Sequence, residues 1–167
     1  MNIIFLDVDG VLNSMTHLIK LYEKNKKPFF GFDTPFDPDC LKNLKELVIQ
    51  TNSKIVVSST WRKRQKGIEI LLENLKKYEL DKSVIGYTPI FNTNVTRGTE
   101  IKAYLSNLKE NASKLNFIIL DDESDMDELL PHLIKTDANL GLTSENVKLG
   151  IKNLNKKRIK ESDDFER

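Results

Sequence analysis

The sequence predicts an α/β fold in three layers, with a Rossmannoid parallel sheet between two layers of helices. Short apolar runs rich in β-branched residues alternate along the 167-residue chain with longer segments whose apolar residues recur at helical spacing. The chain is long enough to bury one sizeable core and leaves little room for a second. We therefore expect residues 1–167 to form a single domain with the first strand at the centre of the sheet.

The expected strands are short apolar runs. In the expected strand over residues 2–7, the four residues from Ile3 to Leu6 are all apolar, which is typical of a strand buried on both faces of a parallel sheet. Residues 53–58 and 116–120 are of the same kind and contain several β-branched side chains. Weaker runs at 83–87 and 133–136 complete the set.

Helical segments separate these strands. Asp37 followed by Pro38 is typical of a helix start, because the Asp side chain caps the first turn and proline fits the first helical position. A second helix is expected over 62–78, and a third begins near Thr96. The expected inward side chains are Leu41, Leu44, Leu47 and Val48 in the first helix, Ile68, Leu71, Leu72 and Leu75 in the second, and Ile101, Tyr104, Leu105 and Leu108 in the third.

Two segments lie outside this alternation. Residues 13–36 form an irregular insertion that we expect to be a small flap or minimal cap, although its aromatic side chains could also shape a substrate pocket or a partner surface. Residues 145–167 are polar and are expected to be a surface helix or a tail. The aromatic residues of the insertion are Phe29, Phe30, Phe32 and Phe36.

Composition narrows the classes of site and partner. Lys and Arg number 26 against 25 Asp and Glu, a formal net charge of +1, so overall charge argues neither for nor against a polyanionic partner. The single cysteine, Cys40, excludes an internal disulfide and a cysteine-cluster metal site, and its place in a first helical turn favours a packing role. No apolar stretch approaches the length of a membrane span, and no charged leader precedes the first apolar run. We expect a cytoplasmic protein with no membrane partner; the sequence indicates no oligomeric state.

Three expected strands end in polar residues that phosphoryl chemistry can use. Parallel strands bring their carboxyl ends to one edge of the sheet. Carboxylates gathered there repel each other unless a hard cation compensates them, and Mg²⁺ prefers oxygen ligands. The sequence therefore predicts a Mg²⁺ site at this edge. The residues concerned are Asp7 and Asp9 after the first strand, Ser58 at the end of the second, and Asp121 and Asp122 after the fourth.

In type and order these residues resemble the motifs of the haloacid dehalogenase (HAD) superfamily of aspartate-nucleophile phosphohydrolases. The first motif is matched by Asp7-Val8-Asp9-Gly10-Val11, the second by Ser58 after an apolar strand, and the fourth by Asp121-Asp122. The resemblance spans residues 3 to about 143. More narrowly, the stretches DVDGVLN, SSTWR, RGTEI and LDD are similar to the small HAD domains of bacterial, phage and RNA-repair-associated proteins.

The resemblance leaves two positions open. The third motif, a basic residue near a helix start, is matched by Arg97, with Lys102 as the substitute candidate. Either side chain supplies a positive charge, but Arg departs from the more common Lys. The later acidic position of the fourth motif is matched by Asp127, with Asp125 as an alternative.

The resemblance implies a role for each position. Asp7 would be the nucleophile that forms an aspartyl-phosphate, and Asp9 would be the general acid and base. The implied metal ligands are the Asp7 carboxylate, the Asp9 main-chain carbonyl and Asp122, with Asp121 and Asp127 as support behind them. The implied phosphate-binding residues are Ser58, Ser59 and Arg97, although Ser59 could equally cap the helix that follows.

These features predict a Mg²⁺-dependent phosphomonoester hydrolase whose open site would admit nucleotides or phosphorylated nucleic-acid ends. One alternative is a small-molecule sugar phosphatase or nucleotidase. Another is a non-catalytic module that binds nucleic acid through residues 61–66, where basic side chains follow Trp61. Both acids of the first motif are present, which argues against that module, and a solvated helix face with a packed indole is the simpler interpretation of residues 61–66.

Overall fold

The sheet consists of five parallel strands in the spatial order β3-β2-β1-β4-β5. The computed structural model describes the backbone of residues 1–108 and 115–163 and the side chains of this part up to residue 155. β1 is central because both sides of its apolar run are buried, with Ile4 and Leu6 in one core and Ile3 and Phe5 in the other. The strands are β1 (Asn2–Leu6), β2 (Ser53–Val57), β3 (Val84–Tyr87), β4 (Asn116–Asp121) and β5 (Leu133–Lys135).

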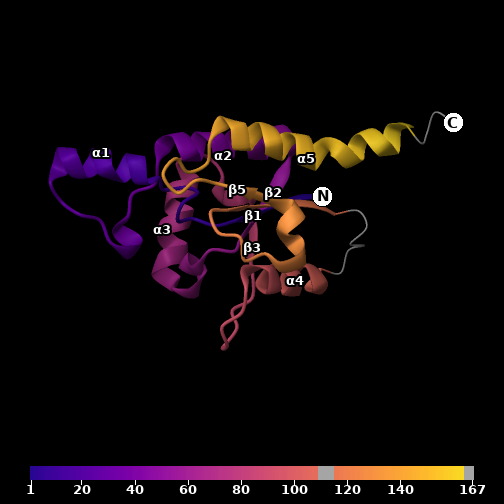
Figure 1. The fold of residues 1–167 in the computed structure, drawn as a ribbon, viewed down its shortest axis with the longest axis horizontal. Coiled ribbons are helices and arrows are strands. Elements are labelled where there is room, and N and C mark those ends of the chain that lie inside the picture. The colour runs from indigo at the N-terminus through magenta and orange to yellow at the C-terminus, as the bar shows by residue number, and fades with distance from the viewer. Residues whose placement is uncertain (109–114, 164–167) are drawn as a thin grey trace.

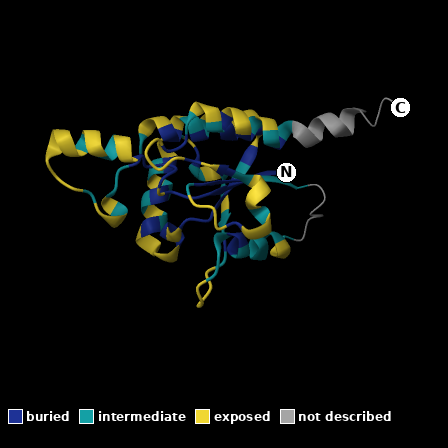
Figure 2. Ribbon diagram, in the orientation of Figure 1, coloured by how far each residue is buried: buried dark blue, intermediate teal, exposed yellow. Residues whose placement is uncertain are grey.

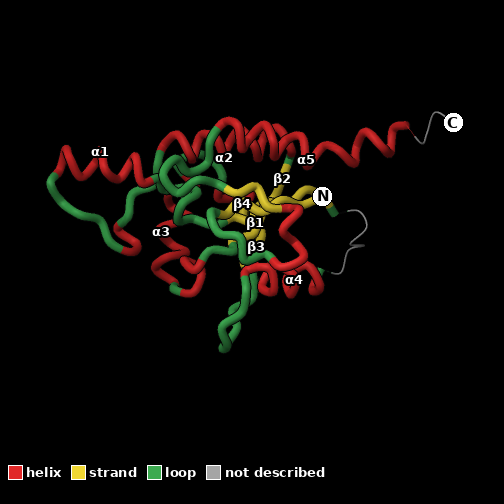
Figure 3. Tube along the Cα trace, viewed as in Figure 1, coloured by secondary structure: helices red, strands yellow, loops and turns green. Residues whose placement is uncertain are grey.

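Helices cover both faces of the sheet, which confirms the three-layer α/β class (Figures 1 and 3). The larger core lies under α2 (Pro38–Thr51), α3 (Gln65–Lys76) and α5 (Ser144–Asp163), and α2 and α5 run side by side. The smaller core lies under α4 (Arg97–Asn107) and contains Ile101. Buried residues accordingly gather along the strands and the inner sides of the helices (Figure 2). No large cap is inserted among the described residues.

Two helices begin where the sequence predicts. The Asp37 carboxylate accepts a hydrogen bond from the Asp39 amide at 2.9 Å, ahead of Pro38 at the start of α2. Thr96 Oγ1 accepts one from the Thr99 amide at 3.2 Å, and α4 begins at the next residue.

The expected helix over 62–78 starts later. Residues Thr60–Lys63 form a 3₁₀ turn, η2, in which the Trp61 and Arg62 side chains are buried, and α3 begins only at Gln65. The prediction that residues 61–66 form a solvated face is therefore wrong for Arg62, whereas the packed indole is confirmed. The basic side chains of residues 63, 64 and 66 are exposed.

The insertion is more regular than its sequence suggested. Helix α1 (Met15–Asn25) occupies half of it and projects from the body of the molecule (Figure 1). Ser14 caps this helix, since its Oγ accepts a hydrogen bond from the His17 amide at 3.1 Å. Apolar residues recur at helical spacing within α1, so the sequence does contain a helical pattern at this place. No α1 residue is buried. A second short turn, η1 (Gly31–Asp33), follows.

Cys40 is buried in the first turn of α2, as expected for a packing residue. Its Sγ lies 3.7 Å from the Leu140 carbonyl oxygen. Burial raises the pKa of the thiol to about 12, so the reactive thiolate is suppressed at neutral pH. No helix in the described ranges has both the length and the apolar character needed to cross a membrane.

Candidate metal and phosphate site

Three carboxylates meet at the carboxyl ends of β1 and β4. The two strands are parallel neighbours with Leu6 beside Leu120, so Asp7 and Asp121 follow in register, and the Asp7 amide donates to the Leu120 carbonyl at 3.0 Å. Asp7 and Asp121 are buried, and Asp122 is half-buried. One oxygen of each carboxylate lies within 4.8 Å of the others. This group could hold a metal ion, and an all-oxygen donor set suits a hard cation such as Mg²⁺.

The protein alone does not fully compensate this acidic group. Burial raises the pKa of Asp7 to about 6, although the Arg97 guanidinium opposes the shift. Burial and the Asp7 charge raise the pKa of Asp121 to about 7, and burial also raises that of Asp122. Asp121 Oδ2 is buried without a hydrogen bond from any described residue. An added cation would provide the missing compensation, so these residues fit a divalent metal.

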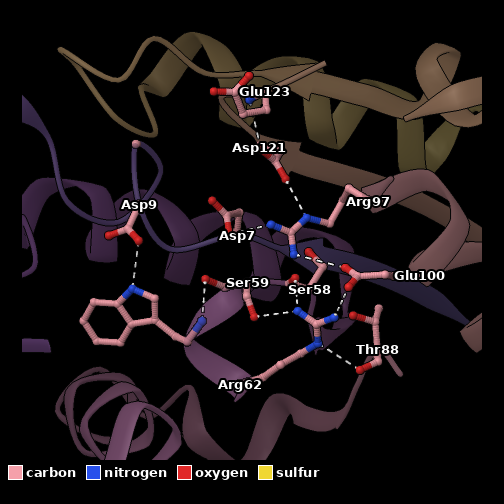
Figure 4. Close-up of polar contacts among 12 residues, drawn as sticks. Asp7, Asp9, Ser58, Ser59, Arg62, Thr88, Arg97, Glu100, Asp121 and Glu123 are labelled. Carbon is pink, nitrogen blue, oxygen red and sulfur yellow. Dashed lines mark hydrogen bonds and ion pairs between the residues drawn. The ribbon is translucent and has the colours of Figure 1, made fainter. Parts of the chain in front are cut away.

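The Asp9 side chain is directed away from the acidic group (Figure 4). Its Oδ2 accepts a hydrogen bond from Trp61 Nε1 at 2.9 Å, and its Oδ1 accepts one from Asn13 Nδ2 at 2.7 Å. The family resemblance implies that Asp9 binds the metal only through its main-chain carbonyl and that Asp121 lies behind the ligands. The geometry instead groups the Asp121 carboxylate with those of Asp7 and Asp122.

Gly10 leaves room for the Asp122 carboxylate. Its φ of +71° is a left-handed conformation that glycine adopts without cost. A Cβ built on Gly10 would lie 2.5 Å from Asp122 Cγ and Oδ2. The glycine of the first motif therefore allows the fourth motif to approach the first.

Arg97 reaches the acidic group from the first turn of α4. Its Nη2 lies 3.6 Å from Asp7 Oδ1, and its Nε lies 3.5 Å from Asp121 Oδ2. Lys102, the other candidate for the third motif, instead pairs with the exposed Glu128 at 2.7 Å. Of the two, Arg97 is the cation beside the carboxylates.

The two later acids hold the start of α4. Asp125 Oδ2 accepts a hydrogen bond from the Arg97 amide at 2.9 Å, and Asp127 accepts one from the Thr96 hydroxyl. Gly98 is required in this contact, because its Cβ would lie 2.3 Å from the Met126 carbonyl oxygen. Asp125 thus positions Arg97 through its main-chain amide, and Asp127 holds the capping residue before it. Neither acid belongs to the carboxylate group.

The two serines after β2 differ in their surroundings. Ser58 Oγ is buried and has no hydrogen-bond partner among the described residues. Ser59 Oγ accepts a hydrogen bond from the Trp61 amide at 3.3 Å, which is the capping role left open by the sequence. The Ser59 side chain also hydrogen-bonds to Asp7, and this lowers the pKa of that carboxyl against the larger effect of burial. Ser58 therefore has a free hydroxyl, whereas Ser59 already has partners.

A comparison with known families agrees with this arrangement. The family model described as the HAD domain in Swiss Army Knife RNA repair proteins matches residues 3–147. The chain belongs to this family. The matched range contains every residue of the site, and the resemblance drawn from the four motifs is confirmed. No curated protein matches the chain.

The HAD domain also contains a buried ion pair that the sequence did not indicate. The Arg62 side chain is 1% exposed and that of Glu100 is 8% exposed. The five N–H groups of the guanidinium meet five acceptors, of which Figure 4 labels the residues Ser58, Ser59, Thr88 and Glu100. The acceptors are the carbonyls of Ser58 (2.7 Å), Ser59 (2.8 Å), Thr88 (2.9 Å) and Pro89 (3.0 Å), and the Glu100 carboxylate (2.7 Å).

Glu100 links this pair to the acidic site. Its Oε1 binds Arg62, and its Oε2 lies 3.4 Å from Arg97 Nη1. The buried Glu100 carboxylate therefore links Arg62, which binds the loops after β2 and β3, to Arg97, which lies beside Asp7. No periodic pattern in the sequence marks either residue, because the contact joins positions in two different elements.

Mg²⁺ is expected to stabilise the HAD domain more at about pH 8 than at about pH 5. The raised pKa values of Asp7 and Asp121 mean that the metal-free folded state binds more protons than the unfolded chain between about pH 4 and pH 7. Its free energy of unfolding therefore falls as the pH rises through this range, and Mg²⁺, which binds deprotonated carboxylates, restores the loss. Thermal denaturation with and without Mg²⁺ measures this; Mg²⁺ at about 100 times its Kd adds about 2.7 kcal/mol.

Two variants control this experiment. Asp122→Asn removes a carboxylate of the group and should abolish the stabilisation by Mg²⁺. Asp39→Asn alters an exposed acid in α2 and should leave the stabilisation unchanged. An equal stabilisation at both pH values, or one that survives Asp122→Asn, would contradict the metal site.

Gly10→Ala is expected to weaken Mg²⁺ binding by tenfold or more, as measured by titration calorimetry. The new methyl group would occupy the space of the Asp122 carboxylate. Gly31→Ala is the matched control, because Gly31 also has a positive φ, +52°, but has no atom within 4 Å of the added Cβ. Both variants should lose about 1 kcal/mol to backbone strain, so equal Mg²⁺ affinity in the two would refute the steric argument.

Proposed function

We propose that this HAD domain is a Mg²⁺-dependent phosphomonoester hydrolase that acts through an aspartyl-phosphate on Asp7. The observation that carries the proposal is the position of the Asp7 carboxylate, which is shared by the acidic group and by Arg97. A carboxylate that lies between a metal site and a guanidinium can attack a negatively charged phosphoryl group, because the metal ion and the guanidinium reduce the repulsion between the two anions. When bound to Asp7, Asp121 and Asp122, Mg²⁺ would neutralise phosphoryl oxygens.

The proposed reaction has two steps, in which Asp7 is the nucleophile and Asp9 transfers the protons. The Asp7 carboxylate attacks phosphorus, the bond between phosphorus and the leaving oxygen breaks, and Asp9 gives its proton to that oxygen. Asp9 then takes a proton from the water that attacks the aspartyl-phosphate, which releases inorganic phosphate and restores Asp7. The hydrogen bonds from Trp61 and Asn13 hold the Asp9 carboxylate in one orientation, which supports its role as the acid and base.

Arg97 and Ser58 are the proposed ligands of the phosphoryl oxygens. The guanidinium of Arg97 can present two parallel N–H groups to a phosphate. Ser58 Oγ is a buried hydroxyl without a partner among the described residues, and such a group destabilises the fold unless it serves a ligand. Asp125, Asp127 and Glu100 would act through Arg97 rather than on the phosphate.

Phosphorylated nucleic-acid ends or nucleotides are the proposed substrates. The family is described by its occurrence in RNA repair proteins, and terminal phosphates of RNA are phosphomonoesters. No large cap covers the site in the described ranges, so a bulky substrate can reach Asp7. The binding-module alternative loses support because Trp61 and Arg62 are buried and occupied by internal contacts.

Asp7→Asn is expected to abolish Mg²⁺-dependent phosphate release, by a factor of about 10³ or more, since the amide cannot form the aspartyl-phosphate. Phosphate release should be followed on nucleoside monophosphates, on oligonucleotides with 3′ or 5′ phosphates and on a sugar phosphate. Asp39→Asn serves as the control and should retain the wild-type rate. Activity that survives Asp7→Asn would overturn the mechanism. Salt-sensitive oligonucleotide binding without any hydrolysis would favour a binding module instead.

Glu100→Gln is expected to weaken the binding of inorganic phosphate about tenfold in the presence of Mg²⁺, because the amide no longer fixes Arg97 by charge. In an Arg97→Met background the same substitution should have almost no further effect, since residues that act through one contact are non-additive. Calorimetric phosphate titrations of the four proteins measure this coupling. Equal losses in both backgrounds would show that Glu100 contributes to folding alone, and thermal denaturation reports that contribution separately.

A further inference from the structure

A pocket of about 300 Å³ opens beside Asp9, between the insertion and the loop after β2. One wall comes from the η1 turn and the residues around it, and the other comes from the η2 turn. Asp9, the proposed acid and base, is part of the lining. The lining residues are Asp9, Gly31, Phe32, Thr34, Thr60 and Trp61.

The aromatic wall of this pocket is held in place without a ligand. The rings of Phe32 and Trp61 meet edge to face, with centroids 5.1 Å apart at 71°, and Phe36 packs on the same indole at 5.2 Å. Gly67 in α3 makes room for the Phe32 ring, because a Cβ at this position would lie 2.7 Å from Phe32 Cε1. The half-buried Phe32 is therefore a fixed surface rather than a mobile flap residue.

The lining favours an uncharged group with a flat face. Asp9 is the one charged residue among the described lining residues, and no Lys or Arg contributes to it. Two threonine hydroxyls can hydrogen-bond to a polar edge, and the Phe32 ring can stack on an aromatic ligand. A volume near 300 Å³ is at the lower end of small-molecule sites, which gives room for one nucleoside and not for a longer chain.

The pocket lies where the leaving group of the proposed reaction would be, because Asp9 lines it. Asp9 and Arg97 lie on either side of Asp7 (Figure 4). In-line attack by Asp7 places the leaving oxygen on the side of phosphorus opposite the Asp7 carboxylate, and Asp9 must reach this oxygen to protonate it. Whatever is bonded to the leaving oxygen would therefore lie next to Asp9, at the mouth of the pocket that Asp9 lines.

We infer that this pocket binds the nucleoside that carries the scissile phosphate, with its base stacked on Phe32. The inference rests on the proposed hydrolase function and adds the pocket that recognises the nucleoside and the residue that selects it. A free mononucleotide and the terminal nucleoside of a polynucleotide present the same chemistry to the pocket. Whichever of the two is the substrate would be preferred over a phosphorylated sugar or polyol, which has no flat face to stack.

The test compares kcat/KM for three substrates: a nucleoside monophosphate, an oligonucleotide with a terminal phosphate and glycerol phosphate. In the wild-type protein at least one nucleoside substrate should exceed glycerol phosphate by about tenfold or more, the range that stacking of one base provides. Phe32→Leu should remove most of this preference and leave glycerol phosphate hydrolysis within about twofold of wild type. Phe32→Tyr, which keeps the aromatic face, should retain the preference.

Phe30→Ala is the matched control, because Phe30 is 74% exposed, lies two residues away and does not line the pocket. It should behave as wild type on all three substrates. The two nucleoside substrates distinguish a mononucleotide site from a site for polynucleotide ends. Equal losses on all three substrates in Phe32→Leu would mean that Phe32 only supports Trp61 and Asp9, and would overturn the inference.

The two proposals fail in different ways. If the wild-type protein hydrolyses none of the substrates, the hydrolase function itself is wrong. If it hydrolyses glycerol phosphate as well as both nucleoside substrates, the function stands and the nucleoside pocket is refuted. Thermal denaturation of Phe32→Leu shows whether the variant is folded, and Phe32→Tyr gives the answer independently if it is not.

Discussion

The crowding of three carboxylates at the ends of β1 and β4 is the constraint on which the rest of the site depends. Oxygens within 4.8 Å of one another, two of them from buried side chains, repel strongly in a poorly solvated place. Arg97 supplies one positive charge against three acids, and its own helix must begin where the guanidinium can reach them. The contacts of Asp125, Gly98 and Asp127 at the start of α4 all serve this placement.

A second charge balance lies behind the first. Glu100 is shared between two guanidiniums, so neither Arg62 nor Arg97 is left in the interior without a partner. Arg62 in turn donates hydrogen bonds to carbonyls after β2 and β3 and so links the two loops that follow these strands. The acidic group, Arg97, Glu100 and Arg62 form a continuous series of alternating charges from the edge of the sheet into the core.

Much of this molecule can be predicted from its sequence, and the exceptions share a physical reason. Apolar runs define the strands, and the topology of a parallel sheet brings Asp7, Ser58 and Asp121 together without further information. The capping residues Asp37 and Thr96 mark their helices because capping is local. The bond from Trp61 to Asp9 and the pair of Arg62 with Glu100 join residues 52 and 38 positions apart, and no local rule specifies such contacts. Helix α1 is different, because the Ser14 cap and the helical spacing of its apolar residues are both local signals from which the helix could have been predicted.

The two halves of the insertion differ in how closely they pack against the core. The half that contains Phe32 and Phe36 packs on Trp61, whereas α1 contributes no buried side chain. The free energy of folding therefore constrains the sequence of the second half and leaves that of α1 largely unconstrained. Helix α1 is accordingly the place where an engineered segment can be grafted with little loss of packing, whereas a change in the aromatic half would disturb the packing on Trp61 beside Asp9.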